Sequence, residues 1–177
     1  MRSAVSRRGF IVWRVLLAIV SDTHLPRGGR ALPPACVAAM RSADLIVHAG
    51  DFSSAEVLIE IEALGPPVAA VHGNVDSFEL RAMLPAERVI DAGGVAIGIV
   101  HDGGPSRGRL ERLRRRFPGA AAVIFGHSHL PLHERAPDGF QIFNPGSPTE
   151  RRRAPAHTMG IGRVEGGALT LEHLTLG

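Results

Sequence analysis

The sequence predicts an α/β (α+β) protein in which two mixed β-sheets pack face to face with helices outside. Over the first two thirds of the chain, short apolar runs alternate with stretches of helical periodicity, which is typical of α/β structure. After Gly126 the pattern changes to short strands separated by glycine-rich turns, which favours antiparallel pairing. With 177 residues and 45% hydrophobic content, the chain fits a single domain over residues 1–177, with residues 1–13 as a basic extension.

Each expected element follows from its residue pattern. Apolar, mostly β-branched runs predict strands at residues 11–20, 45–47, 68–71, 95–100 and 121–125. Apolar residues at helical spacing predict helices at residues 33–41, 54–64 and 106–117, with Ser53 or Ser54 as the cap of the second helix. In the last third we expect short strands at residues 131–135, 140–143, 157–164 and 169–174, with hairpin turns at Asp138-Gly139 and Gly166-Gly167.

Composition limits the compartment and the partners. The formal net charge is only +3, and all 20 basic residues are arginine. Cys36 is the only cysteine, which excludes an internal disulfide and agrees with a reducing compartment. Residues 6–10 resemble a twin-arginine export signal, but the apolar run that follows contains Arg14 and is too short to span a bilayer. We therefore expect a cytoplasmic protein without a membrane anchor.

Residues able to bind metal ions follow five of the predicted strands. They are Asp22, His24, Asp51, Asn74, His101, His127 and His129. The carboxyl ends of strands form the edge at which open α/β sheets bind ligands. In an extended chain, residues i and i+2 point the same way, so the Asp-x-His pair and the His-x-His pair can each send two side chains to one side. Glycines at positions 50, 73 and 126 precede predicted ligands and indicate turns where backbone must approach closely.

The set of motifs resembles a known family. The motifs are Asp22-Thr23-His24, Gly50-Asp51, Gly73-Asn74, His101 and Gly126-His127-Ser128-His129. In this order they resemble the calcineurin-like metallophosphoesterase superfamily, and in particular its small, single-domain YfcE-type phosphodiesterases. The turn Asn144-Pro145-Gly146-Ser147 is similar to one that these small members also carry. The resemblance extends from about Val15 to the C-terminus and implies a four-layer αββα sandwich with a dinuclear metal site.

The resemblance also implies a role for each ligand. Asp22, His24 and His129 would hold the first metal. Asn74, His101 and His127 would hold the second, and Asp51 would bridge both. The residues expected to take part in catalysis are Asp22, Asp51, Asn74 and His101.

The donor chemistry agrees with this assignment without the family. Four imidazoles, two carboxylates and one amide favour Mn, Fe, Co, Ni or Zn over Mg or Ca. Two metals about 3.5–4 Å apart can share a hydroxide and clamp the attacking and leaving oxygens of a phosphate ester. We therefore expect two divalent ions, manganese first among them. The expected activity is hydrolysis of phosphodiester bonds, with monoesters as a second class, by attack of a metal-bridging hydroxide on a small phosphate ester.

Two departures from the family pattern concern the leaving group. Phosphatases of this superfamily often have a histidine after the motif asparagine, and here that position is Val75. Many relatives read His-Gly-His at the fifth motif, whereas this chain reads His101-Asp102-Gly103. Asp76 or Asp102 could protonate the leaving oxygen instead. We expect good leaving groups to be favoured and, because no cap segment is inserted, an open site.

The other histidines have a structural interpretation beside a functional one. His48 and His72 precede motif glycines, so each could orient a ligand or simply be a satisfied, partly buried histidine. His133, His157 and His173 lie on predicted late strands, where we expect surface or structural roles.

Two groups of arginines are candidates for phosphate contacts. Residues 107–116 contain six arginines, but the apolar spacing favours a solvated amphipathic helix, and few aromatic residues are present to stack on bases. One of residues 151–153, all arginine, could reach a substrate phosphate. Two alternative functions stay open: a nuclease, which would need a basic groove, and a non-catalytic interaction scaffold such as the retromer subunit of this fold. None of the seven ligand positions is replaced, which argues against the scaffold.

Overall fold

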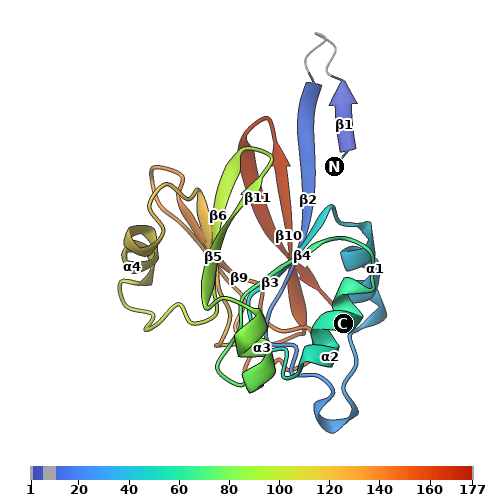
Figure 1. The fold of residues 1–177 in the computed structure, drawn as a ribbon. Coiled ribbons are helices and arrows are strands. Elements are labelled where there is room, and N and C mark those ends of the chain that lie inside the picture. Colours follow the sequence, from blue (N-terminus) through green and yellow to red (C-terminus); the bar gives the residue numbers. More distant parts are fainter. Residues whose placement is uncertain (1, 6–10, 177) are drawn as a thin grey trace.

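The computed structural model describes residues 2–5 and 11–176, which form two sheets packed face to face between helices (Figure 1). The helices α1 (Pro34–Ser42), α2 (Ala55–Glu62) and, through Leu80, α3 (Phe78–Met83) pack on the first sheet. The helix α4 (Arg109–Arg116) packs on the outer face of the second sheet. The predicted αββα sandwich is therefore confirmed.

The first sheet has the strand order β11-β10-β2-β3-β4, with β1 paired to β2. Its strands are β1 (Arg2–Val5), β2 (Ile11–Val20), β3 (Leu45–His48), β4 (Val68–Ala70), β10 (Thr158–Glu165) and β11 (Ala168–Thr175). The central strands β2, β3 and β4 are parallel, whereas β10 is antiparallel to both of its neighbours. The parallel strands therefore deliver the segments that follow them to one edge of the sheet.

The second sheet has the order β5-β6-β7-β9-β8. Its strands are β5 (Glu87–Ala92), β6 (Val95–Val100), β7 (Ala122–Ile124), β8 (Leu132–Arg135) and β9 (Gln141–Asn144). The strands β6, β7 and β9 are parallel, and the edge strands β5 and β8 are antiparallel to their neighbours. The segments after β6 and β7 thus leave the sheet in the same direction.

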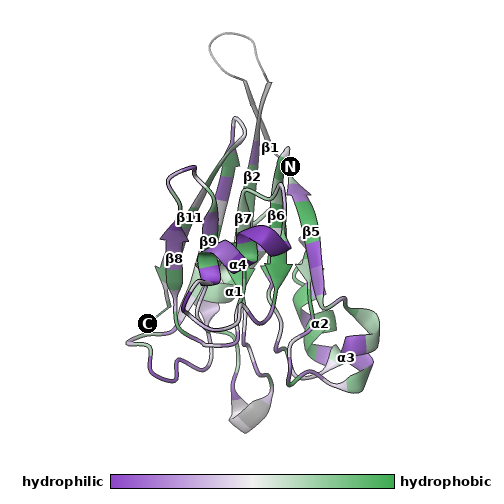
Figure 2. Ribbon diagram, turned by 90° about the vertical axis from the view of Figure 1, so that its left-hand side faces the viewer, coloured by the Kyte–Doolittle hydropathy of each residue, from purple (hydrophilic) through white to green (hydrophobic). Residues whose placement is uncertain are grey.

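Three apolar clusters hold the four layers together. The largest lies between the sheets and includes the fully buried Leu17, Ile97 and Phe143. A second lies beneath α1 and α2, and a third, with Leu113 of α4, covers the outer face of the second sheet. Figure 2 shows the corresponding colouring, with apolar strands inside and a largely hydrophilic α4 outside. The arginine-rich segment is thus an amphipathic helix that buries Leu113, as predicted. Arg115 and Arg116 are exposed, whereas Arg109 and Arg112 are half-buried and donate to backbone carbonyls of residues 103–105.

Several elements differ from the prediction. The strands β1 and β5 and the helix α3 were not predicted, and β1 lies inside the segment expected to be an extension. The pairing of β9 with β7 is parallel, so the antiparallel prediction for the last third is wrong for this pair. Ser54 occupies the N-cap of α2, but its side chain makes no capping hydrogen bond. The residues that resemble an export signal, 6–10, lie outside the described residues.

None of the helices in the described part of the chain combines the length and the apolar character that a membrane span requires.

Candidate metal centre

The predicted ligands lie in loops that follow β2, β3, β4, β6 and β7. Five of the seven have left-handed backbone conformations, namely Asp22, His24, Asp51, His127 and His129, with φ between 45° and 70°. Such a conformation costs about 1–3 kcal/mol at a residue other than glycine. The prediction of an extended chain at the Asp-x-His and His-x-His pairs is therefore wrong. The loops turn sharply instead, and this sends His127 and His129 to different halves of the site.

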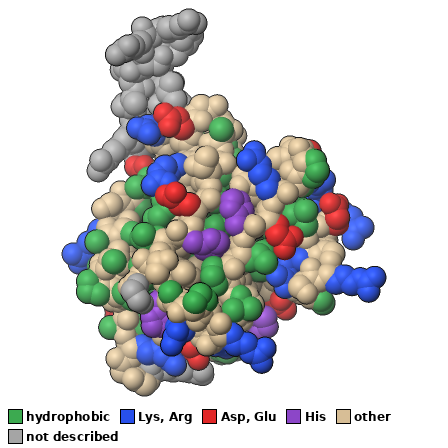
Figure 3. Space-filling view, turned by 180° about the vertical axis from the view of Figure 1, so that it is seen from behind, with side chains coloured by type: hydrophobic (Ala, Val, Ile, Leu, Met, Phe, Trp, Pro, Cys, Tyr) green, Lys and Arg blue, Asp and Glu red, His purple; other side chains and the backbone are tan. Residues whose placement is uncertain are grey.

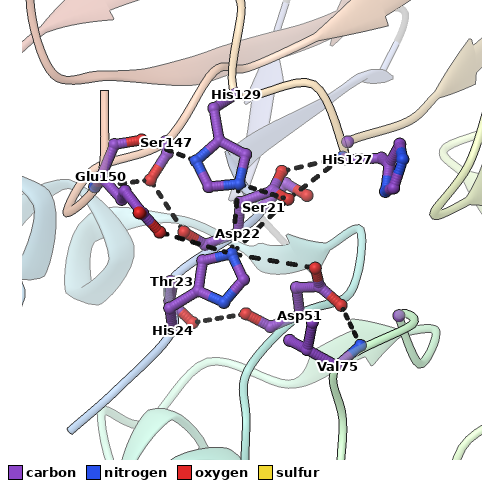
Figure 4. Close-up of polar contacts among 12 residues, drawn as sticks. Ser21, Asp22, Thr23, His24, Asp51, Val75, His127, His129, Ser147 and Glu150 are labelled. Atoms are coloured by element: carbon purple, nitrogen blue, oxygen red, sulfur yellow. Dashed lines mark hydrogen bonds and ion pairs between the residues drawn. The ribbon is translucent and has the colours of Figure 1, made fainter. Parts of the chain in front are cut away.

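The first half of the site contains Asp22, His24 and His129, all almost completely buried (Figure 4). The Nε2 atoms of His24 and His129 are 3.1 Å apart. Asp22 Oδ1 is 3.3 Å from His129 Nε2 and 4.0 Å from His24 Nε2. One donor atom from each residue therefore converges on a single point, within 4.8 Å of the others.

The second half contains Asn74, His101 and His127. Asn74 Oδ1 is 3.0 Å from His101 Nε2 and 2.8 Å from His127 Nδ1. Asn74 and His127 are exposed, whereas His101 is buried. The two halves therefore differ in access, because the second opens to solvent and the first does not.

Carboxylates join the two halves. Asp51 Oδ2 is 3.2 Å from His101 Nε2 and 3.8 Å from His24 Nε2, so this oxygen faces both halves. Asp22, Asp51 and His101 form a second group of donor atoms within 4.8 Å of one another. Asp22 thus belongs to both groups, so two carboxylates have donor atoms near both halves, where the family resemblance suggested Asp51 alone.

The glycines that precede the predicted ligands leave no room for a side chain. A Cβ atom on Gly73 would lie 2.0 Å from Asp51 Oδ1, and one on Gly126 would lie 1.8 Å from Ser21 Oγ. At Gly50, whose φ is +91°, a Cβ would lie 2.8 Å from the backbone nitrogen of Gly73. The predicted close approach of backbone at these three positions is confirmed.

Asp76 holds two ligand loops together. Its carboxylate accepts hydrogen bonds from the backbone N–H groups of Gly73 (2.6 Å), Ser53 (2.8 Å) and Asp51 (3.1 Å). Both of its oxygens are thus occupied inside the protein, at 4% exposure. The suggestion that Asp76 protonates a leaving group is therefore wrong, because its carboxylate faces backbone rather than the open half of the site.

Hydrogen bonds determine which ring nitrogen each ligand histidine presents. His101 Nδ1 lies 2.8 Å from the carbonyl of Ala49, and His129 Nδ1 lies 2.6 Å from the carbonyl of Glu150. A carbonyl only accepts, so each Nδ1 carries a proton and donates it. The Nε2 atoms, which face the carboxylates, are then available to bind a metal ion.

His48 connects the loops that follow β2 and β3 through two hydrogen bonds. Its Nδ1 accepts a hydrogen bond from the N–H of Gly50 at 3.1 Å, so its Nε2 carries the proton and donates to Thr23 Oγ1 at 3.1 Å. Burial is the largest cause that lowers the pKa of His48 well below its usual value. The sequence left two roles open for His48, and these hydrogen bonds favour the role in which it orients the ligand loops. His72 is half-buried, and its Nδ1 contacts the carbonyl of Gly73.

The turn at residues 144–147 ties the second sheet to the first ligand loop. Ser147 Oγ donates to the carbonyl of Asp22 at 2.7 Å, and Asn144 Nδ2 donates to the carbonyl of Gly126 at 2.8 Å. Two residues further on, Thr149 Oγ1 donates to the carbonyl of Thr23 at 2.6 Å. This turn therefore positions the loops of Asp22 and His127 relative to each other, a role that the motif alone did not reveal.

Burial and neighbouring charges give the two carboxylates, Asp22 and Asp51, very different pKa values. Burial is the main cause that raises the pKa of Asp22 from 3.8 to about 7. Burial would also raise the pKa of Asp51, but the hydrogen bond and charge of His101 and the N–H of Val75 outweigh it and hold that pKa at about 2. Burial lowers the pKa of His129 to about 4, which keeps this ligand neutral near neutral pH.

Glu150 is a site residue that the sequence did not single out. Its Oε2 is 3.8 Å from His24 Nε2 (Figure 4). Its Oε1 is 3.6 Å from an Nη atom of Arg30. It reaches the site because the 144–150 segment folds back over the loop of Asp22. No spacing in the sequence relates Glu150 to His24, so only the fold could identify it.

The arginines predicted as candidates for phosphate contacts, residues 151–153, differ in their surroundings. Arg152 and Arg153 line a small cavity with Ser128 and Leu130, beside the loop of His129. Arg151 instead donates to the carbonyl of Pro155. The late histidines 133 and 173 make structural contacts, with Gln141 and with the carbonyl of Asn144, as predicted.

Comparison with known proteins decides the family. The sequence profile of the calcineurin-like phosphoesterase superfamily domain matches residues 15–167. This chain belongs to that superfamily. A "probable metallophosphoesterase" of Methanothermobacter thermautotrophicus is 34% identical over 165 residues, which cover 92% of this chain and 94% of the relative.

Solved structures share the fold of this calcineurin-like protein. Vps29 of Entamoeba histolytica, solved in complex with zinc, superposes with a TM-score of 0.70 at 20% identity, over 92% of this chain and 99% of that one. A structure described as a novel archaeal phosphodiesterase gives a TM-score of 0.67 at 22% identity, over 91% and 99% of the two chains. At these identities the likeness concerns the fold.

The residues present fit the metal ions that the superfamily implies. Two groups of three donor residues converge within 4.8 Å, all buried, and the groups share a carboxylate. Imidazole and carboxylate donors in this proportion suit divalent transition metals. In addition, the proton on Nδ1 of His101 and of His129 is held by a backbone carbonyl, which directs Nε2 to the site.

Proposed function

We propose that this calcineurin-like protein is a dinuclear metal-dependent phosphoesterase that hydrolyses phosphodiester bonds, with phosphomonoesters as a second substrate class. The observation that supports this most strongly is the pair of adjacent donor groups that share Asp22, with Asp51 Oδ2 facing both His101 and His24. A site that bound one structural ion would need neither the second group nor an exposed half.

The residues of the chain have distinct tasks in this proposal. Bound divalent ions would activate the attacking water and neutralise charge on the phosphoryl oxygens. Asp22, His24 and His129 would hold one ion in the buried half, and Asp51 would hold both. Asn74, His101 and His127 would hold the other ion, and the exposure of Asn74 and His127 leaves room for the phosphate ester on that side.

The preferred leaving group depends on whether a side chain near Asn74 can donate a proton to it. Val75 carries no proton to give, and the carboxylate of Asp76 is occupied by backbone N–H groups. Asp102 is exposed beside His101 and is the remaining acidic candidate. We propose that the enzyme favours esters whose leaving oxygen needs little protonation, such as aryl phosphodiesters.

The first test is hydrolysis of an aryl phosphodiester and an aryl phosphomonoester by metal-stripped protein before and after addition of manganese. We expect turnover only with metal, and faster turnover of the diester. Nickel, cobalt, iron and zinc would be compared, since the donor set suits all of them.

Asp51→Asn is the matching variant. The amide keeps the shape but removes the charge that both halves share, so we expect activity to fall by at least about a hundredfold, as for groups that hold a metal in place. Circular dichroism would check folding. Full activity in a folded Asp51→Asn protein would rule out the proposed role, and metal binding without turnover on any ester would favour an interaction module.

The nuclease alternative would need a basic groove at the site. On the face shown in Figure 3, arginine side chains are interspersed with acidic and apolar ones. This face therefore carries no continuous basic surface.

A further inference from the structure

A second depression opens beside the exposed half of the metal centre. It is a cavity of about 370 Å³, and its wall includes His72, Asn74, Arg81, His101, Asp102 and Arg116. Asn74 and His101 are also predicted metal ligands. A phosphate ester held at the metals would therefore extend directly into this cavity, which we call the Arg81–Arg116 pocket.

Arg81 is held in the pocket wall without an acidic partner. It comes from α3, and its guanidinium donates to two backbone carbonyls, that of Asp76 at 3.0 Å and that of Asn74. Within residues 2–5 and 11–176, no carboxylate lies at ion-pair distance from it. Carbonyls fix the orientation of a guanidinium but do not cancel its charge, so Arg81 presents a positive charge to the pocket.

Arg116 comes from the opposite layer of the sandwich, at the end of α4. Its Nε donates to Glu87 Oε2 at 2.5 Å, which fixes the head group and leaves other N–H groups for a ligand. The acidic member of the wall, Asp102, accepts a hydrogen bond from the N–H of Gly104 at 2.7 Å. The wall thus contains two arginines and one carboxylate. Glu87, outside the wall, offsets the charge of Arg116, so Arg81 is the wall arginine whose charge no carboxylate of the described residues pairs with.

We propose that the Arg81–Arg116 pocket binds a second anionic group of the substrate. The ligand class is a phosphodiester whose organic substituent carries a carboxylate or a phosphate. A pocket of this size accommodates one small group, and arginines are the side chains best suited to recognise planar or tetrahedral anions. This inference rests on the proposed phosphoesterase function and specifies which esters that site prefers.

The test compares two aryl diesters of similar size with the manganese-loaded protein. One is propyl p-nitrophenyl phosphate, and the other is 2-carboxyethyl p-nitrophenyl phosphate, which adds one negative charge. We expect kcat/KM for the carboxylated ester to exceed that for the propyl ester by about tenfold at low ionic strength, the usual size of a charge-assisted contact. Added salt should reduce this ratio.

Arg116→Met and Arg81→Met should each bring the ratio toward one. Arg114→Met is the matched control, because Arg114 lies on the same helix and pairs with Asp138 much as Arg116 pairs with Glu87, but it does not line the pocket. The ratio isolates charge recognition, since a displaced Asn74 loop in Arg81→Met would slow both esters alike. Should Arg81→Met fail to fold, Arg116→Met decides the question.

The assays distinguish failure of the Arg81–Arg116 pocket from failure of the proposed phosphoesterase activity. Equal kcat/KM for the two esters in the wild type, or a ratio that Arg116→Met leaves as high as Arg114→Met does, would overturn the pocket and leave the esterase intact. Absence of turnover on both esters with every metal would overturn the proposed function and this inference with it.

Discussion

The two carboxylates of the metal centre have opposite environments. Asp22 has no exposed surface, and this burial raises its pKa to about 7. The pKa of Asp51 is held at about 2, because the hydrogen bond and charge of His101 and the N–H of Val75 outweigh the effect of its burial. In the metal-free protein near neutral pH, Asp51 is thus always charged, whereas Asp22 is about half protonated.

This difference predicts how metal affinity depends on pH. A metal ion binds the carboxylate form, so below pH 7 it must displace the proton on Asp22. We expect the proton on Asp22 alone to lower affinity for manganese or zinc by about tenfold for each pH unit below 7, and to have no effect well above it. Burial would lower the pKa of His101, but the hydrogen bond with Asp51 and the charge of Asp22 outweigh it and raise that pKa, so the proton on His101 adds to this slope. Calorimetric titrations in buffers of different ionisation enthalpy would measure both the affinity and the protons released. Affinity that is flat from pH 5.5 to 7 would contradict the raised pKa.

At the scale of the elements, the ligand loops depend on residues that bind no metal. Asp76 joins the loops after β3 and β4 through three backbone N–H groups. His48 and Ser147 hold the loop of Asp22 and its neighbours from two other sides. The ligand geometry is therefore a property of several elements together.

Asp76→Asn tests this dependence. The amide places an NH₂ group against a backbone donor, so the loops of Asp51 and Asn74 should shift. We expect metal affinity to drop by about 10–100-fold, as for other residues that orient ligands. Asp91→Asn is the control, since Asp91 also accepts a backbone N–H, from Gly94 at 2.9 Å, but lies near the end of β5, away from the ligand loops. Equal affinities of the two folded variants would show that Asp76 does not position the ligands.

The sequence predicted the site better than it predicted the loops. The order of strands and acidic, histidine and asparagine residues was enough to select seven residues that the structure brings together. The left-handed backbone was not predictable, because neither Asp nor His at the strand ends reveals it. Likewise β5 is an edge strand in which charged and apolar residues do not alternate regularly, and α3 has only six residues. The contact of Glu150 with His24 depends on tertiary folding.

At the scale of the whole molecule, the two sheets contribute ligands almost equally. Asp22, His24, Asp51 and Asn74 follow strands of the first sheet, whereas His101, His127 and His129 follow strands of the second. The apolar cluster between the sheets, which includes Leu17 and Ile97, therefore sets the spacing of the two sets.

Metal binding should accordingly stabilise the entire fold. An ion at 100 times its dissociation constant adds about 2.7 kcal/mol to the free energy of unfolding, which corresponds to a rise in Tm of roughly 5–10 °C for a chain of this size. We expect this rise in the wild type on addition of manganese or zinc, and a much smaller one in Asp51→Asn. Differential scanning calorimetry would measure it, and an unchanged Tm at saturating metal would contradict a site shared by both sheets.

The division of the ligands between the sheets also determines when the site can form during folding. The N–H of His127 bonds to the carboxylate of Asp22, and Ser147 bonds to the carbonyl of the same residue, across sequence separations of 105 and 125. Contacts of such high contact order form late, after the intervening loops have closed. An intermediate with only one sheet assembled would present at most four of the seven ligands. We therefore expect metal capture to be a late step of the folding reaction, and its rate after dilution from denaturant would report completion of the native topology.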